Sequence, residues 1–428
     1  MKTASFIGGA LCLIAAVAQA QPDTDISRGE YLARAANCVA CHTKSGGAAL
    51  AGGLEMETPL GNIYATNITP DNETGIGTYT LEDFDNAMRQ GIAQDGHRLY
   101  PAMPYPSYAK ISDEDIAALY DYFMNEVPAV RLENKESEIP WPLSIRWPLA
   151  IWNVLFFDDE TYEADEDQSE AWNRGAYLVQ GLGHCGACHT PRGLAWNEVA
   201  TDESGPEYLA GAFLDNWYAS DLTQSNRAGL GRWSQDDLAT FMKTGRNMHS
   251  TAFGTMDEVI INSTQYLTDD DLDAMATYLL SLPAAHSDGE YKYDDTTLAT
   301  LRSPERRNNS GANLYMQNCE SCHVDTGIGY PPYLPPLAGN PPVMDPDPAS
   351  LINIILNGSS RLIVDGTPDA YRMPGYRKSL NDQQIADIVT FMREGWGNNA
   401  SEVTAEQVAD LRDLTEPAGD RMPVLRMK

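Results

Sequence analysis

Three scarcities limit what this chain can be. Its 428 residues carry 29 basic against 61 acidic side chains, a formal net charge of −32. A surface this acidic repels nucleic acid and anionic lipid headgroups, so we expect no nucleic-acid binding and a protein that stays soluble or meets a basic partner. Beyond the first twenty residues, the sequence contains no apolar run long enough to cross a bilayer. Cysteine is also rare, at seven residues, and its placement decides the class of protein.

The first twenty residues have the pattern of a secretory signal peptide. Lys2 is followed by an apolar run over residues 6–17 and by the small-residue sequence AQA at residues 18–20. We therefore expect residues 1–20 to be removed before Gln21 and the mature protein to be periplasmic. Cys12 lies inside the apolar run. Because Leu11 precedes it where a lipoprotein signal needs a small residue, we expect no lipid anchor there.

The other six cysteines all fall in C-x-x-C-H sequences, at residues 38–42, 185–189 and 319–323. Two thiols on one helical turn can form thioethers to the two vinyl groups of a haem, while the following histidine reaches the iron. A single copy would also suit a thiol redox pair or half of a zinc site. Three copies in an exported chain, with no cysteine left over, instead predict three covalently bound haem c groups. The predicted attachment residues are Cys38, Cys41, Cys185, Cys188, Cys319 and Cys322, and the predicted iron ligands are His42, His189 and His323.

The chain repeats itself around these motifs. A short helical segment precedes each motif, at residues 27–32, 173–178 and 310–315, and two more helices follow it. The last helix of each repeat begins at a capping residue, Ser112, Thr268 or Asn381, in most cases with acids in the first turn. Apolar residues then recur at helical spacing. Three helices around a haem resemble the class I cytochrome c plan, so we expect a mainly α fold of three tandem domains of this class.

These observations divide the chain into seven parts. We expect a signal peptide at 1–20, cytochrome c domain 1 at 21–135, a linker at 136–168, domain 2 at 169–284, a second linker at 285–305, domain 3 at 306–398 and a C-terminal tail at 399–428. The stretch 158–170 holds eight acids and no base, which is typical of a solvated connector. One helix is predicted within the tail, over residues 404–414.

The second axial ligand of each iron decides what the haem can do, because methionine raises the potential and favours electron transfer over chemistry. Domain 1 offers Met103, in a proline-rich loop that can hold a thioether in place, and domain 3 offers Met373 before a proline. Domain 2 offers Met248, His249 and Met256, of which Met256 has the spacing from its haem histidine closest to that in domain 1. Core positions are expected for Met56, Met88, Met124, Met242 and Met275.

Several other residues near the haem motifs allow two readings each. The segment Pro336-Leu337 offers a backbone carbonyl to orient the ring of His323, although a plain turn is an equal alternative. Arg192 suits a haem propionate and equally an ordinary surface position. Surface or structural positions are expected for His97, His184 and His286.

Longer sequence patterns resemble one known family. They are TPLGNIYATNITPD at residues 58–71, LYPAMPY at 99–105, TPR at 190–192, AFGTM at 252–256 and WGN at 396–398. With the three haem motifs, they make the chain similar to the triheme cytochrome c subunits of bacterial membrane-bound dehydrogenases for alcohols, gluconate, fructose and related polyols or aldehydes. The matching patterns run along the whole mature chain.

The resemblance implies a function and a set of partners. The chain would pass electrons from a dehydrogenase catalytic subunit of FAD or PQQ type, accompanied in some complexes by a small third subunit, to ubiquinone or a terminal oxidase. It would work at the outer face of the inner membrane and have no catalytic site of its own. Two alternatives stay open: a free-standing multihaem carrier, and a multihaem peroxidase, which needs an iron with an open or displaceable sixth position.

One departure from the family concerns the membrane. Family members commonly meet it through an apolar C-terminal segment, whereas the tail here is mostly polar. The nearest substitute is the first linker, where residues 141–157 include five large aromatics interrupted by prolines and Arg146. Such a segment can dock on the catalytic subunit or dip into the membrane interface, and packing against its own domains is an equal alternative.

Overall fold

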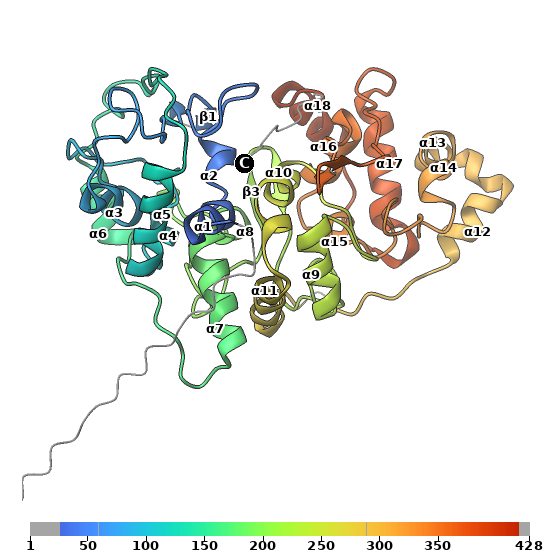
Figure 1. The fold of residues 1–428 in the computed structure, drawn as a ribbon. Coiled ribbons are helices and arrows are strands. Elements are labelled where there is room, and N and C mark those ends of the chain that lie inside the picture. The colour runs from blue at the N-terminus through green and yellow to red at the C-terminus, as the bar shows by residue number, and fades with distance from the viewer. Residues whose placement is uncertain (1–25, 59, 288, 419–428) are drawn as a thin grey trace, which may run out of the picture.

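The computed structural model describes residues 26–58, 60–287 and 289–418. The predicted signal peptide, with Cys12, and the end of the tail lie outside these residues. The described chain is mainly helical, as expected, with three small two-stranded hairpins. Figure 1 shows the three predicted domains side by side, with domain 1 in blue and teal, domain 2 in green and yellow, and domain 3 in orange and red.

Each domain has a helix before the haem motif, a middle helix and a long last helix, and its hairpin precedes the middle helix in domains 1 and 2 but follows it in domain 3. Domain 1 contains α1 (Arg28–Ala35), α2 (Cys38–Cys41), β1 (Glu55–Thr58), β2 (Gly61–Tyr64), α3 (Leu81–Gln90), α4 (Tyr105–Tyr108) and α5 (Asp113–Asn125). Domain 2 contains α7 (Glu170–Tyr177), the π-helical turn η1 (Leu178–Leu182), α8 (Gly186–His189), β3 (Ala212–Leu214), β4 (Trp217–Ala219), α9 (Gln235–Thr244), α10 (Thr255–Asn262), the 3₁₀ turn η2 (Thr264–Tyr266) and α11 (Asp269–Ser281). Domain 3 contains α13 (Ser310–Asn318), α14 (Glu320–His323), α15 (Pro341–Met344), α16 (Ala349–Asn357), β5 (Ile363–Val364), β6 (Thr367–Pro368), α17 (Asp382–Glu394) and η4 (Gly395–Gly397).

Helices also occupy the segments between and after the domains. The first linker contains α6 (Leu149–Phe156), and the second contains α12 (Thr296–Arg302), followed by η3 (Pro304–Asn308). The sequence predicted neither helix. The tail helix is confirmed: α18 (Ala405–Leu414) begins after Thr404, whose side chain accepts a hydrogen bond from the backbone of Gln407.

Capping fixes where the long helices begin. The side chains of Ser112, Thr268 and Asn381 each accept a hydrogen bond from a backbone N–H in the first turn of α5, α11 and α17. The predicted starts of these three helices are therefore confirmed. Carboxylates in the first turns of α5 and α11 stabilise these helix ends further, because the N-terminus of a helix carries a partial positive charge.

The first and last helices of each domain cross at a glycine. A Cβ atom added at Gly29, Gly175 or Gly311 would lie 2.0 to 2.2 Å from a backbone carbonyl oxygen of α5, α11 or α17. Any larger residue would push the two helices apart. The same crossing in three places supports the division of the chain into three repeats.

Domains 1 and 2 share one hydrophobic core, whereas domain 3 has its own. The shared core is closed by two reciprocal clusters. In each, an aspartate in the first turn of a domain's last helix accepts hydrogen bonds from an arginine of its own domain and a tyrosine of the other. The clusters are Asp115 with Arg28 and Tyr177, and Asp271 with Arg174 and Tyr31.

Domain 3 cannot build this joint from its sequence. Counted from the crossing glycine and the capping residue, its matching positions hold Ser310, Asn313 and Gln384 in place of arginine, tyrosine and aspartate. It packs on domain 2 through other contacts, including a small cluster in which Leu362 lies against Ile260 and Ile261 of α10.

Candidate haem sites

The six motif cysteines lie on or beside the short helices α2, α8 and α14, and none of them forms a disulfide. Burial raises the pKa of the Cys38, Cys185 and Cys319 thiols to about 12. A thiol redox pair depends on a lowered pKa, so this environment disfavours that reading. No group of three histidine, cysteine or carboxylate side chains converges as a metal ion needs within the described residues, and the zinc alternative therefore has no support there.

Each motif histidine is oriented by a backbone carbonyl. The Nδ1 atoms of His42 and His189 lie 2.7 Å from the carbonyl oxygens of Thr66 and Ser220. For His323 the partner is the carbonyl of Pro335, at 3.0 Å, so the carbonyl predicted at Pro336-Leu337 is wrong by one residue. With Nδ1–H donated in this way, Nε2 is left free to bind iron. Burial also lowers the pKa of all three histidines, which keeps the rings neutral, as a metal ligand must be.

A cavity of about 580 Å³ in domain 1 brings four predicted site residues together: Cys38, Cys41, His42 and Met103. The rest of its wall is mainly apolar and includes Ile63, Ile68, Ile76, Phe84, Met88 and Phe123. Two thiols, a neutral imidazole and a thioether around an apolar space are the donor set and the surroundings that a covalent haem requires. The residues present therefore fit the group.

The first linker closes one side of this cavity. Ile139 and Arg146 line it, and the Arg146 guanidinium lies 3.8 Å from the centre of the Tyr100 ring and donates to the carbonyl of Arg98. Tyr100 and Arg98 precede Met103 in the same loop. The linker thus stabilises the loop that presents the predicted axial methionine.

In domain 2 the structure separates the three candidate ligands. Met248 is 60 % exposed, and His249 stacks on Trp233 with ring centres 5.2 Å apart and pairs with Asp237. Met256 lies in the first turn of α10, partly buried against the small cluster around Ile260. The two alternatives are thus exposed or engaged elsewhere, and Met256 stays the predicted ligand.

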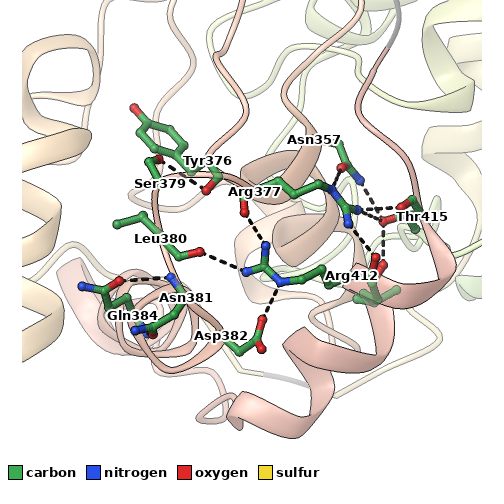
Figure 2. A network of polar contacts seen from close by, with 11 residues as sticks. Asn357, Tyr376, Arg377, Ser379, Leu380, Asn381, Asp382, Gln384, Arg412 and Thr415 are labelled. Carbon is green, nitrogen blue, oxygen red and sulfur yellow. Dashed lines mark hydrogen bonds and ion pairs between the residues drawn. The ribbon is translucent and has the colours of Figure 1, made fainter.

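In domain 3, Met373 packs against the core. Its backbone N–H donates to the hydroxyl of Ser359, and its carbonyl accepts from the backbone N–H of Ser359. The loop that follows is held by the tail helix α18, as Figure 2 shows. Arg377 of the loop donates to the carbonyl and the hydroxyl of Thr415. In return, Arg412 of α18 donates to the carbonyl of Leu380 and pairs with Asp382. The sequence predicted α18 but not its role in holding this loop.

Arg192 does not occupy an ordinary surface position. One guanidinium nitrogen donates to the carbonyl of Ala187, inside the second haem motif, at 2.5 Å, and another lies 3.6 Å from Glu198. The side chain therefore ties the motif helix to the loop after it. His184, in front of the same motif, packs edge-on against Tyr108 of domain 1 with ring centres 5.6 Å apart. It is structural, one of its two predicted alternatives.

The remaining predictions concern surface and core side chains. His97 is exposed beside Asp95, and His286 donates from Nε2 to the carbonyl of Ala210. The predicted core methionines Met88, Met242 and Met275 are buried, and Met124 packs against the core. Met56 instead lines the cavity of domain 1 from strand β1.

The aromatic segment of the first linker divides between two environments. Trp152 donates to the carbonyl of Ala195 and, with Phe157, packs edge-on against Tyr105, so these two side chains are internal packing. The opposite face of α6 is apolar and exposed. We define the α6 surface as Ile151, Val154 and Leu155 on this face together with Trp147, which precedes the helix; each is 53 to 84 % exposed. Among the described residues, no helix combines the length and the apolar content needed to cross a membrane.

Comparison with known proteins gives consistent matches. The cytochrome c family model matches residues 26–125 and 309–396. The chain is 50 % identical over 424 residues to the cytochrome c subunit of the alcohol dehydrogenase (quinone) of Komagataeibacter europaeus, covering 96 % of this chain and 90 % of that one. It is 50 % identical over 396 residues to the gluconate 2-dehydrogenase cytochrome c subunit of Pantoea cypripedii, covering 91 % and 90 %. It is 40 % identical over 425 residues to the fructose dehydrogenase cytochrome subunit of Gluconobacter japonicus, covering 94 % and 85 %.

Proposed function

Because this chain belongs to the family of cytochrome c subunits of bacterial dehydrogenases, we propose that it carries three haem c groups and relays electrons through them. The protein is an electron-transfer subunit, and its partner is a dehydrogenase. The observation that carries the count of three is the repeated geometry of the motifs: in each domain a partly buried first cysteine stands beside a histidine whose Nδ1 meets a backbone carbonyl.

The iron ligands we propose are His42 with Met103, His189 with Met256, and His323 with Met373. We call the groups attached to domains 1, 2 and 3 haem 1, haem 2 and haem 3. When bound, each supplies an iron that takes up and releases one electron. The apolar cavity of domain 1 and the neutral histidines suit a buried, permanently ligated iron. A methionine on each iron leaves no open position, which favours electron transfer over the peroxidase alternative.

The electron donor is a catalytic subunit of FAD or PQQ type, and the acceptor is ubiquinone or a terminal oxidase. A small third subunit is an optional member of the complex. We place this complex in the periplasm, at the outer face of the inner membrane. Support comes from the N-terminal sequence pattern and from the relatives: one is a subunit of a dehydrogenase named for a quinone.

Purification of the complex from native membranes tests this function. The tagged chain is isolated under mild detergent, bound proteins are identified by mass spectrometry, and alcohols, gluconate and fructose are each added to the oxidised complex. We expect a flavin or quinone-cofactor dehydrogenase to co-purify and one of its substrates to reduce the haems. If the chain is isolated alone and no substrate reduces its haems when the membrane fraction is restored, it is a free-standing carrier.

A further inference from the structure

The backbone that orients the haem 2 histidine is held by another domain. Ser220 follows β4 in domain 2, and its carbonyl oxygen lies 2.7 Å from Nδ1 of His189. Its hydroxyl donates a 2.7 Å hydrogen bond to Oδ2 of Asp345, which follows α15 in domain 3. Two hydrogen-bonding steps therefore lead from a carboxyl of domain 3 to the proximal ligand of haem 2.

Asp345 is fixed in this position from several sides. It is fully buried, and its backbone carbonyl accepts a 2.9 Å hydrogen bond from Arg393, which is 1 % exposed. Arg393 also donates to the carbonyl of Val343 in α15. Burial raises the pKa of Asp345 well above its usual range, because the charged carboxylate would lose its hydration there.

The rest of the hairpin is bound to domain 3 as well. Ser350 of α16 accepts from the backbone N–H of Tyr218 at 2.8 Å and donates to its carbonyl at 2.9 Å. Asn353 donates to the carbonyl of Asn216 at the turn of the hairpin. The hairpin β3–β4 is therefore a joint between domains 2 and 3, with the contact to Asp345 at its haem end.

Domain 1 holds its equivalent carbonyl differently. Thr66 is followed by Asn67, whose backbone N–H donates to Asn134 and whose side chain donates to the carbonyl of Val130. Both partners belong to the end of domain 1 itself. Domain 1 therefore holds its histidine-orienting carbonyl with its own residues, whereas domain 2 holds the equivalent carbonyl with residues of domain 3.

We propose that Asp345 of domain 3 is a positioning residue for haem 2, acting through Ser220 on His189. This inference rests on the proposed function, since it requires haem 2 to be present. A carbonyl held firmly against Nδ1–H increases the electron donation of the imidazole and favours the oxidised iron. The hydrogen bond from Ser220 to Asp345 of domain 3 therefore keeps the reduction potential of haem 2 low, and weakening this bond raises that potential.

Variants of the two hydrogen-bonded side chains test the proposal. Ser220→Ala removes the hydroxyl but keeps the carbonyl, Asp345→Ala removes the carboxyl, and Asp345→Asn keeps an acceptor oxygen. Ser204→Ala is the matched control. The Ser204 hydroxyl also donates to an aspartate, but this is Asp202 of its own domain, and the pair contacts no predicted haem ligand. Midpoint potentials are measured by optical redox titration, and low-spin ferric signals by electron paramagnetic resonance, on the purified protein.

We expect Ser220→Ala and Asp345→Ala to raise one midpoint potential and shift one ferric signal, with Asp345→Asn restoring most of both and the control changing neither. The affected haem is one that Met103→Leu and Met373→Leu do not affect. Three unchanged midpoints in Ser220→Ala overturn the inference, even if Asp345→Ala fails to assemble. Fewer than three haems by denaturing mass in the unaltered protein contradict the proposed function instead, so the two failures are distinguishable.

Discussion

The hydroxyl of Tyr31 in domain 1 donates a 2.6 Å hydrogen bond to Oδ2 of Asp271 in domain 2. Tyr177 makes the same contact with Asp115 in the opposite direction. Burial raises the pKa of both tyrosines, so both hydroxyls stay protonated and act as donors. Domains 1 and 2 are therefore joined as one pair, to which domain 3 is added through a different surface.

Removing this joint should destabilise the pair of domains. Each of Tyr31→Phe and Tyr177→Phe leaves a buried aspartate with one hydrogen bond fewer, and we expect each to lower the free energy of unfolding by about 1 to 3 kcal/mol. Chemical unfolding of the haem-loaded protein measures the loss. Tyr293→Phe is the control, because this tyrosine is exposed and its hydroxyl donates to the carbonyl of Thr326. Losses equal to that of the control would show that the joint contributes nothing.

Each predicted axial methionine should govern one haem. Met103→Leu, Met256→Leu and Met373→Leu each keep a side chain of similar volume but remove the thioether that stabilises reduced iron. We expect every variant to lower one midpoint potential and to change the absorption of one haem. Met124→Leu, at a position that packs against the core, should change neither. A variant whose spectrum and potentials match those of the unaltered protein removes its methionine from the set of ligands.

The α6 surface is expected to dock on the catalytic subunit or at the bilayer edge, because exposed apolar patches of this kind mark contact surfaces. Trp147→Gln should keep the haems and the stability but release the chain from the dehydrogenase or from membranes. Trp152→Gln should instead lower stability, since this side chain packs on Tyr105. Sedimentation with membranes and co-purification measure the first effect, and thermal unfolding the second. Full binding of the Trp147 variant contradicts the docking prediction.

Local sequence was enough to predict much of the fold and to place the haem motifs on short helices. The haem motifs, the caps at Ser112 and Thr268, and the tail helix after Thr404 depend on residues within a few positions of one another. These patterns act through contacts between near neighbours in the sequence, so they can be recognised without knowing the rest of the fold. The match of Met103 with His42 in one cavity also followed from order along the chain.

Contacts between distant segments could not be predicted in this way. The bond from Tyr31 to Asp271 spans 240 positions, and that from Ser220 to Asp345 spans 125. Nothing in the neighbourhood of Asp345 marks it as a partner of domain 2. One signal was available for the first joint: arginine, tyrosine and aspartate recur at matching positions in the first two repeats but not in the third.

The central claim is that one chain holds three haems for electron transfer, and its most direct test is the intact mass of the mature protein under denaturing conditions. The protein should be produced in a host with a working haem-attachment system, so that thioether bonds can form. We expect the mass of residues 21–428 plus three haems, all retained after denaturation. A mass with two haems or fewer in the major species would contradict the account.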